Sequence, residues 1–181
     1  MPAPGGGGVS AVTAALAAGL VAMAARFSTA QLPAAGNIAE QADRLRHRVA
    51  GLADEDATAY QAVLDAFALP RGADGRRERI RDTLHGAATV PLEIAEVAAQ
   101  VGQLATGVAA DGNPNLCGDA ITAAYLAEAS ARSAAALVDV NVRLGSLPAD
   151  LSQRAARAVA SAHAAATRAA NQKEGQKAEG Q

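Results

Sequence analysis

Apolar residues recur every three or four positions along most of this chain, which is the spacing of one face of an α-helix. In the first such segment, from about Val9 to Thr29, the large side chains of Leu16, Leu20, Met23 and Phe27 share one stripe. Small residues fill the other faces, so no wide polar face is left for water. We therefore expect this helix to be surrounded by other helices.

Helix breakers and capping signals divide the rest of the chain. Asn37 is followed three residues later by Glu40, the spacing of a capping box, so a second helix is expected to begin there. Pro91 lies inside the third segment, where it either kinks the helix or divides it in two. The predicted helices are 9–29, 37–69, 74–110, 117–144 and 149–170. Residues 171–181 are almost entirely polar and are expected to form a disordered tail, so that residues 1–170 make one domain.

Composition narrows the fold to an all-α bundle of five or six helices. The 181 residues include 51 alanines and only four aromatic rings, two Phe and two Tyr. An interior with so few large side chains closes only where backbones approach closely, which alanine-lined helices do better than β-sheets. At this length a single domain buries a core of ordinary size.

Charge and cysteine content exclude several classes of function. Sixteen basic residues against eighteen acidic ones provide no electrostatic footprint for nucleic acid or an anionic membrane. The apolar stretch from Val9 to Ala25 has no preceding Lys or Arg, so it is neither a good signal peptide nor a convincing membrane span. The single cysteine, Cys117, cannot form an internal disulfide, and the three histidines lack the spacing of a metal site. We expect a cytoplasmic protein without a metal site.

Four glycines, Gly5, Gly6, Gly7 and Gly8, lead into the first helix. Glycine lets the backbone turn its amides inward, and the free N–H groups of a helix N-terminus bind carboxylates or phosphates. No Lys-Ser or Lys-Thr pair follows and no strand pattern precedes, so this is neither a P-loop nor a dinucleotide fingerprint. The alternative is a flexible N-terminus without a binding role.

The acidic run Asp54-Glu55-Asp56 is the second candidate for chemistry. Asp56 and Tyr60 are four residues apart, so on a helix they share a face and can line one cavity, while Asp54 and Glu55 point elsewhere. A carboxyl group beside apolar walls has a raised pKa and can act as a general acid or base. Charges solvated on a helix surface are the alternative.

The third candidate is the turn that contains Asn113 and Asn115 and ends at Asp119. Two asparagines flanking a proline favour a turn, and an aspartate at a helix start is often a cap. The functional interpretation is that these amides and this carboxylate hydrogen-bond a polar heterocycle. Cys117 has no basic neighbour in the sequence and is expected to be a small apolar filler.

In this order, the three features resemble the cyclodeaminase/cyclohydrolase family, which includes the C-terminal domain of formiminotransferase-cyclodeaminase and the bacterial methenyltetrahydrofolate cyclohydrolases. The resemblance runs from Pro4 to about Ala160. It is carried by Pro4 with its glycines, Val21-Ala22-Met23-Ala24-Ala25-Arg26, residues 52–60, Leu69-Pro70, Val90-Pro91-Leu92, and Gly112-Asn113 with Asp119. It implies an all-α homodimer that acts on tetrahydrofolate carrying a one-carbon unit and needs no cofactor.

The resemblance also assigns roles to individual residues. By motif position, Asp119 is the first candidate and Asp56 the second for the group that moves a proton at a tetrahedral carbon between two folate nitrogens. The glycine run and Arg26 are implied to contact the substrate, including its acidic glutamate tail. The other implied substrate contacts are Ser10, Tyr60, Asn113, Asn115 and Asn141.

Three positions depart from the pattern of the family. Relatives have Ser directly after three glycines, whereas Val9 separates Ser10 from the glycine run here, and Gly118 stands where relatives have Ser. Leu137 replaces an Asn in a motif near the end of the fourth predicted helix. The alternative interpretation is a non-catalytic helical dimer that binds folate or a similar small ligand after losing pocket groups.

Overall fold

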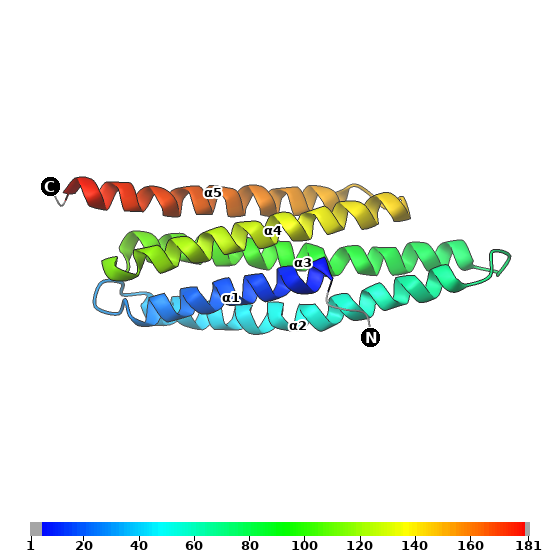
Figure 1. Cartoon of the computed structure of the whole chain (residues 1–181), viewed down its shortest axis with the longest axis horizontal. Helices are drawn as coiled ribbons and strands as arrows, with labels where there is room; N and C mark the ends of the chain where they lie inside the picture. Colours follow the sequence, from blue (N-terminus) through cyan, green and yellow to red (C-terminus); the bar gives the residue numbers. More distant parts are fainter. Residues whose placement is uncertain (1–4, 180–181) are drawn as a thin grey trace.

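The computed structural model describes the backbone of residues 5–179 and the side chains of residues 5–172. Five long helices, and a short 3-10 helix before the fourth, make one all-α domain, as predicted. Figure 1 shows the long helices side by side along the longest axis of the molecule, with the turn between α2 and α3 extending beyond the others. The elements are α1 (Gly6–Arg26), α2 (Ala35–Ala68), α3 (Arg76–Asp111), η1 (Pro114–Leu116), α4 (Cys117–Gly145) and α5 (Asp150–Glu179). Helix α5 continues to Glu179, nine residues beyond its predicted end, so of the tail predicted over 171–181 only residues 180–181 lie outside the described backbone.

Small side chains, mostly alanine, form the core of the bundle. Gly102 of α3 shows how closely the backbones approach, since a Cβ atom added there would lie 3.4 Å from the Cβ atom of Ala165 in α5 and 3.8 Å from that of Ala127 in α4. All four aromatic rings of the chain are exposed instead. They are Phe27, Tyr60, Phe67 and Tyr125. The prediction of a core made of small side chains is thus confirmed, and the aromatic rings lie on the surface.

Helix α1 packs against α2, α3 and α4, but one of its faces stays open. Apart from Val21, its buried residues are Gly, Ala and Ser, whereas Val9, Val12, Leu16 and the C-cap residue Phe27 are more than half exposed. The expectation that other helices surround α1 is therefore wrong for a single copy, because the close contacts between backbones leave no room for its large side chains inside. By length and by its mean hydropathy of 1.9, α1 is also the one helix among the described residues that could cross a membrane, yet 56% of that apolar window is buried in the bundle.

Pro91 neither divides nor ends α3, which runs without a break from Arg76 to Asp111. Proline has no N–H group, so the carbonyl of Ala87 four residues earlier loses its usual partner within the helix. The side-chain amide of Asn141 in α4 donates a hydrogen bond of 2.8 Å to this carbonyl. Asn141 therefore repairs the defect in α3 and joins two helices of the bundle.

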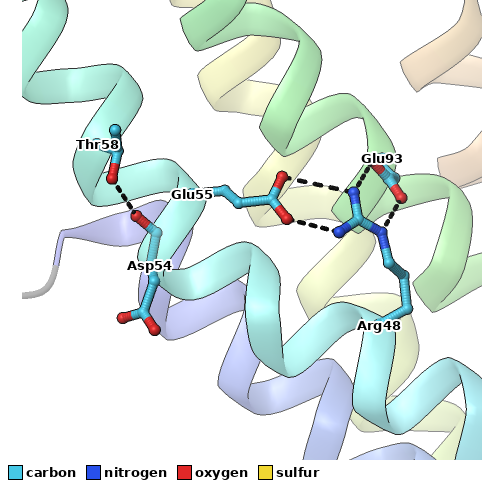
Figure 2. Close-up of polar contacts among 5 residues, drawn as sticks. All are labelled: Arg48, Asp54, Glu55, Thr58 and Glu93. Atoms are coloured by element: carbon cyan, nitrogen blue, oxygen red, sulfur yellow. Dashed lines mark hydrogen bonds and ion pairs between the residues drawn. The ribbon is translucent and has the colours of Figure 1, made fainter.

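Ion pairs cross the outside of the bundle between α2 and α3. The guanidinium of Arg48 contacts Glu55 of its own helix at 2.5 Å and Glu93 of α3 at 2.6 Å (Figure 2). Hydrogen bonds from these two carboxylates, Glu93 foremost, hold the pKa of Arg48 above its ordinary range. All three side chains are more than a third exposed, so water and salt screen the pair and its contribution to stability is small.

We expect Asn141→Leu to lower the free energy of unfolding by about 1–3 kcal/mol, because the carbonyl of Ala87 would then be left without a donor. In a Pro91→Ala background, the restored N–H of residue 91 bonds that carbonyl, so the same substitution should cost less. Chemical denaturation of the four proteins measures the difference. If Asn141→Leu lowered the free energy of unfolding equally in the Pro91 and the Pro91→Ala backgrounds, the hydrogen bond from Asn141 would not be compensating for the N–H group that proline lacks.

Candidate functional site

The glycine run forms the first turn of α1, which begins at Gly6 rather than at Val9. The carboxylate of Asp56 reaches this turn from α2 and lies directly over Gly7, where a methyl group would overlap it. It accepts a hydrogen bond from the backbone N–H of Gly8. The structure therefore brings together two of the candidate features, and Gly7 is a glycine because the carboxylate occupies the space that a Cβ atom would need.

Partial burial sets the electrostatics of Asp56. Desolvation raises the pKa of its carboxyl group, and the hydrogen bond from Gly8 opposes this rise without cancelling it. The two preceding carboxylates behave differently: Glu55 pairs with Arg48, and Figure 2 shows the carboxylate of Asp54 pointing away from that ion pair. The interpretation as solvated charges thus describes Asp54, whereas Asp56 is a half-buried carboxyl group at a helix N-terminus.

Two further predicted residues lie at this end of α1 and differ in accessibility. Tyr60 is one helical turn beyond Asp56, and its ring is exposed. Ser10 is buried, and its hydroxyl donates to the carbonyl of Gly6 at 2.7 Å and lies 2.9 Å from the hydroxyl of Ser133 in α4. Ser130 of the same helix donates to the carbonyl of Ser10 at 2.8 Å. Ser10 thus joins α1 to α4 behind the glycine run, and Tyr60 remains available to a ligand.

The opposite end of α1 holds Arg26, whose guanidinium pairs with Asp43 of α2. Asp43 also contacts Arg46 at 3.2 Å. The hydrogen bond from Arg26, more than any other influence, holds the pKa of Asp43 below its ordinary value. Arg26 and Arg46 therefore share one carboxylate.

The turn that contains Asn113 and Asn115 also lies at this end. The side-chain amide of Asn113 donates to the carbonyl of Phe27 at 3.2 Å, and its oxygen accepts from the backbone N–H of Asn115 at 3.0 Å. The buried hydroxyl of Ser28 accepts from the backbone N–H of Asn113 at 2.9 Å. Asn113 thus shapes the turn and fastens it to α1. Ser28 is a part of this junction that sequence reasoning missed, because a lone serine near a helix end carries no distinguishing signal.

Asp119 lies in the first turn of α4, half-buried, and Asn115 is exposed just before it. Ser130, which bonds Ser10 beside the glycine run, is eleven residues further along α4 than Asp119, and eleven residues of helix span about 17 Å. One copy of the chain therefore groups Asp56 with the glycine run at one end of α1, and Asp119 with Arg26 at the other.

Neither group belongs to a metal site or to the groove at the turn between α2 and α3. Among the described residues, no three His, Cys, Asp or Glu side chains are close enough to hold a metal ion. A groove of about 1000 Å³ lies between the turn from α2 to α3 and the end of α4, where Arg71, Arg77 and Arg81 line it. Neither Asp56 nor Asp119 lines this groove, so the groove is separate from the predicted site.

The sequence profile named Formiminotransferase-cyclodeaminase matches residues 1–159, most of the chain. The chain belongs to this family. A methenyltetrahydrofolate cyclohydrolase of Methylorubrum extorquens is 34% identical over 152 residues, which cover 78% of this chain and 73% of that protein. The formimidoyltransferase-cyclodeaminase of mouse is 30% identical over 151 residues, and the match spans 28% of its length.

A solved structure of the cyclodeaminase/cyclohydrolase family has the same architecture. The formiminotetrahydrofolate cyclodeaminase of Thermotoga maritima superposes with a TM-score of 0.85 at 25% identity, over 97% of this chain and 90% of that one. The resemblance found in the sequence motifs is therefore confirmed at the level of the family and of the fold.

The contact between Asp56 and the first turn of α1 is tested by a pair of glycine substitutions. Gly7→Ala should push the carboxylate into solvent, so we expect the pKa of Asp56, followed by NMR titration, to fall toward its ordinary value. Gly6→Ala is the matched control, because its added methyl would make ordinary contacts of 3.6 Å with Leu137. Alanine favours a helix by up to about 1 kcal/mol over glycine, so only the control should gain stability. An unchanged pKa in Gly7→Ala would refute the contact.

Proposed function

We propose that this chain is a folate one-carbon enzyme that hydrolyses methenyltetrahydrofolate. The observation that carries the proposal is the half-buried Asp56 carboxyl group, with its raised pKa, at the glycine-lined N-terminus of α1. The cyclohydrolase relative, 34% identical over most of both chains, supports the choice of substrate. A second candidate is the cyclodeamination of formimidoyltetrahydrofolate, favoured by the likeness to the Thermotoga maritima cyclodeaminase.

Both reactions pass through a tetrahedral carbon between two folate nitrogens. In the hydrolysis, water adds to the bridging carbon and gives up a proton, one carbon–nitrogen bond then breaks, and a proton returns to the nitrogen that leaves. A single carboxyl group that takes and returns this proton serves both steps, and it works best when its pKa is raised toward neutrality. Asp56 has the environment for this role, so we propose it ahead of Asp119, which is the first candidate by motif position.

We propose that the glycine run binds the substrate. The backbone N–H groups of the first turn of α1, together with the helix dipole, favour an anionic or carbonyl oxygen of the substrate. Tyr60, exposed one turn from Asp56, is the proposed packing contact for the substrate, and Arg26 is the proposed contact for its glutamate tail. We further propose that the enzyme is a homodimer in the cytoplasm.

The alternative is a dimer that binds folate without turning it over. It is favoured by the polar groups missing at Gly118 and Leu137 and by the use of Ser10 to join α1 to α4. A spectroscopic assay with methenyltetrahydrofolate and with formimidoyltetrahydrofolate separates these possibilities. If the protein binds folate but neither substrate reacts faster than in the uncatalysed background, the chain is a folate-binding protein without catalytic activity.

We expect Asp56→Asn to lower kcat at least about 100-fold, since general acid–base groups contribute on the order of 100- to 10,000-fold. Asp119→Asn should lower it as well and leave the circular dichroism spectrum unchanged. Asp54→Asn is the matched control, because this neighbouring carboxylate is exposed, and its activity should equal that of the wild type. An Asp56→Asn protein with normal turnover would remove Asp56 from the mechanism.

The stability of the same variants separates a catalytic role from a structural one. The pKa of Asp56 is higher in the folded chain than in the unfolded one, so folding favours the protonated form. Its contribution to stability is present below the unfolded pKa and is lost as the pH rises through the folded pKa. At neutral pH, Asp56→Asn should therefore be at least as stable as the wild type in thermal denaturation, and the difference should vanish in acid. A large loss of stability at neutral pH would indicate that the charge serves the fold.

A further inference from the structure

The groove of about 1000 Å³ at the turn between α2 and α3 has no part in the folate site proposed above. It is called the hairpin groove below. Its walls come from two parts of the chain that are far apart in the sequence, residues 71–82 on one side and the end of α4 on the other. The hairpin of α2 and α3 that carries it extends beyond the other helices (Figure 1). The groove is therefore open to a ligand at one tip of the bundle.

Hydrogen bonds within the hairpin hold the groove in shape. The guanidinium of Arg76 donates to the carbonyl of Leu69 at 2.9 Å and to that of Phe67 at 3.0 Å, which ties the start of α3 to the end of α2. Within the turn, the backbone N–H of Ala73 donates to the carbonyl of Pro70 at 3.0 Å. A site whose walls are fixed before binding loses less conformational entropy when a ligand arrives.

Three other arginines line the groove with their charges uncompensated. Arg71, Arg77 and Arg81 are exposed, and none of them forms an ion pair within the part of the chain that the structure describes. Elsewhere in the bundle, Arg132 and Arg154 each contact a glutamate carboxylate. A guanidinium group binds a carboxylate or a phosphate through two parallel hydrogen bonds. The hairpin groove thus has three anion-binding groups without an anion.

The spacing of these arginines indicates what kind of anion fits. Arg77 and Arg81 are four residues apart on α3, so they share a face, with about 5–6 Å between their Cβ atoms. Like charges at this spacing destabilise a helix, and an anion bound between them would remove the repulsion. Arg71 adds a third positive charge from the turn. A ligand with two or more negative groups would therefore be held better than a single anion.

Ser146, on the α4 side of the groove, has an unusual backbone conformation. Its φ of 47° makes it the one residue other than glycine with a positive φ in the described chain. Glycine is the residue favoured at such a position after the end of a helix, so the serine costs stability. What the serine adds is a hydroxyl group in the wall of the groove. Strain of this kind is often found at sites that bind a ligand.

We propose that the hairpin groove is a second binding site of this protein, for a small anion with two or more phosphate or carboxylate groups. The guanidinium groups of Arg71, Arg77 and Arg81 bind the anionic groups, and the hydroxyl of Ser146 donates a hydrogen bond to one of them. The ligand joins the hairpin to the end of α4, so its binding stabilises the folded chain. The site does not depend on the proposed folate chemistry.

Three carboxylates also line the groove, and they provide a test of the sign of the ligand's charge. They are Asp74, Glu78 and Asp82, and none of them has an ion-pair partner among residues 5–172. Each carboxylate repels an added anion and competes with it for the arginines. Removing one of these charges should therefore strengthen the binding of an anion, whereas it would weaken the binding of a cation.

Isothermal titration calorimetry of the full chain with pyrophosphate, and separately with citrate, tests the site. We expect saturable binding of at least one probe, and a loss of affinity of about 10-fold in Arg77→Gln and in Arg81→Gln, since a hydrogen bond to a charged group is worth a factor of this order. Arg168→Gln is the matched control, because Arg168 is also exposed but lies on α5, outside this groove. Binding of pyrophosphate alone would assign a phosphate ligand, and binding of citrate alone a carboxylate one.

Two further variants complete the test. Glu78→Gln should bind the probe more tightly than the wild type. Ser146→Gly should have a higher Tm without the probe, because glycine favours the left-handed conformation, and should bind the probe more weakly. The probe should also raise the Tm of the wild type.

Several results would overturn the proposal. They are the absence of saturable binding for both probes, an unchanged affinity in both arginine variants, and weaker binding by Glu78→Gln. An unchanged affinity in Ser146→Gly would remove the serine from the site. None of these measurements involves folate, so their failure leaves the proposed function standing, and a chain without folate turnover leaves the anion site standing.

Discussion

The close approach of α1 to its neighbours is the constraint on which the rest of the structure depends. Alanine and glycine line the buried faces of this helix, so the surrounding backbones come near enough to exclude larger side chains. One consequence is that large side chains of this helix and its C-cap, among them Leu16 and Phe27, are exposed. The other is the contact at Gly7, where the absence of a side chain lets the carboxylate of Asp56 reach the helix N-terminus.

The same packing explains why Asp56 is suited to chemistry rather than to stability. A carboxylate moved out of water and held by one backbone N–H is less stable as an anion than it would be in solvent, and its raised pKa is the measure of that cost. Glu128 shows how another carboxylate of the bundle is kept as a stable anion despite desolvation. Glu128 is desolvated too, but Arg132 and His163 outweigh the desolvation and hold its pKa below the ordinary value. Glu128 is thus paired with positively charged groups, whereas Asp56 has no ion-pair partner among the described residues.

Several residues that the family resemblance marks for ligand binding have a structural role in the bundle. Asn141 fills the hydrogen-bonding gap left by Pro91, Asn113 shapes the turn before α4, and Ser10 joins α1 to α4. These roles could not be read from the sequence, because each depends on a partner 54 to 120 residues away or on the geometry of a turn. Motif position identifies residues that matter to the family, and only the contacts separate a role in folding from a role in binding.

The sequence alone determined the helical class, the five helical segments and the small-residue core, because helix periodicity, breakers and alanine content act locally and need no partner. It also singled out the glycine run and Asp56 as separate features, since each has a chemical signature of its own. Tertiary structure decided that these two features meet, that Asp119 lies at the far end of α1, and that the large side chains of α1 face outward. The physical reason is that helical periodicity shows which residues share a face, whereas the width of the gap between helices decides which face is buried.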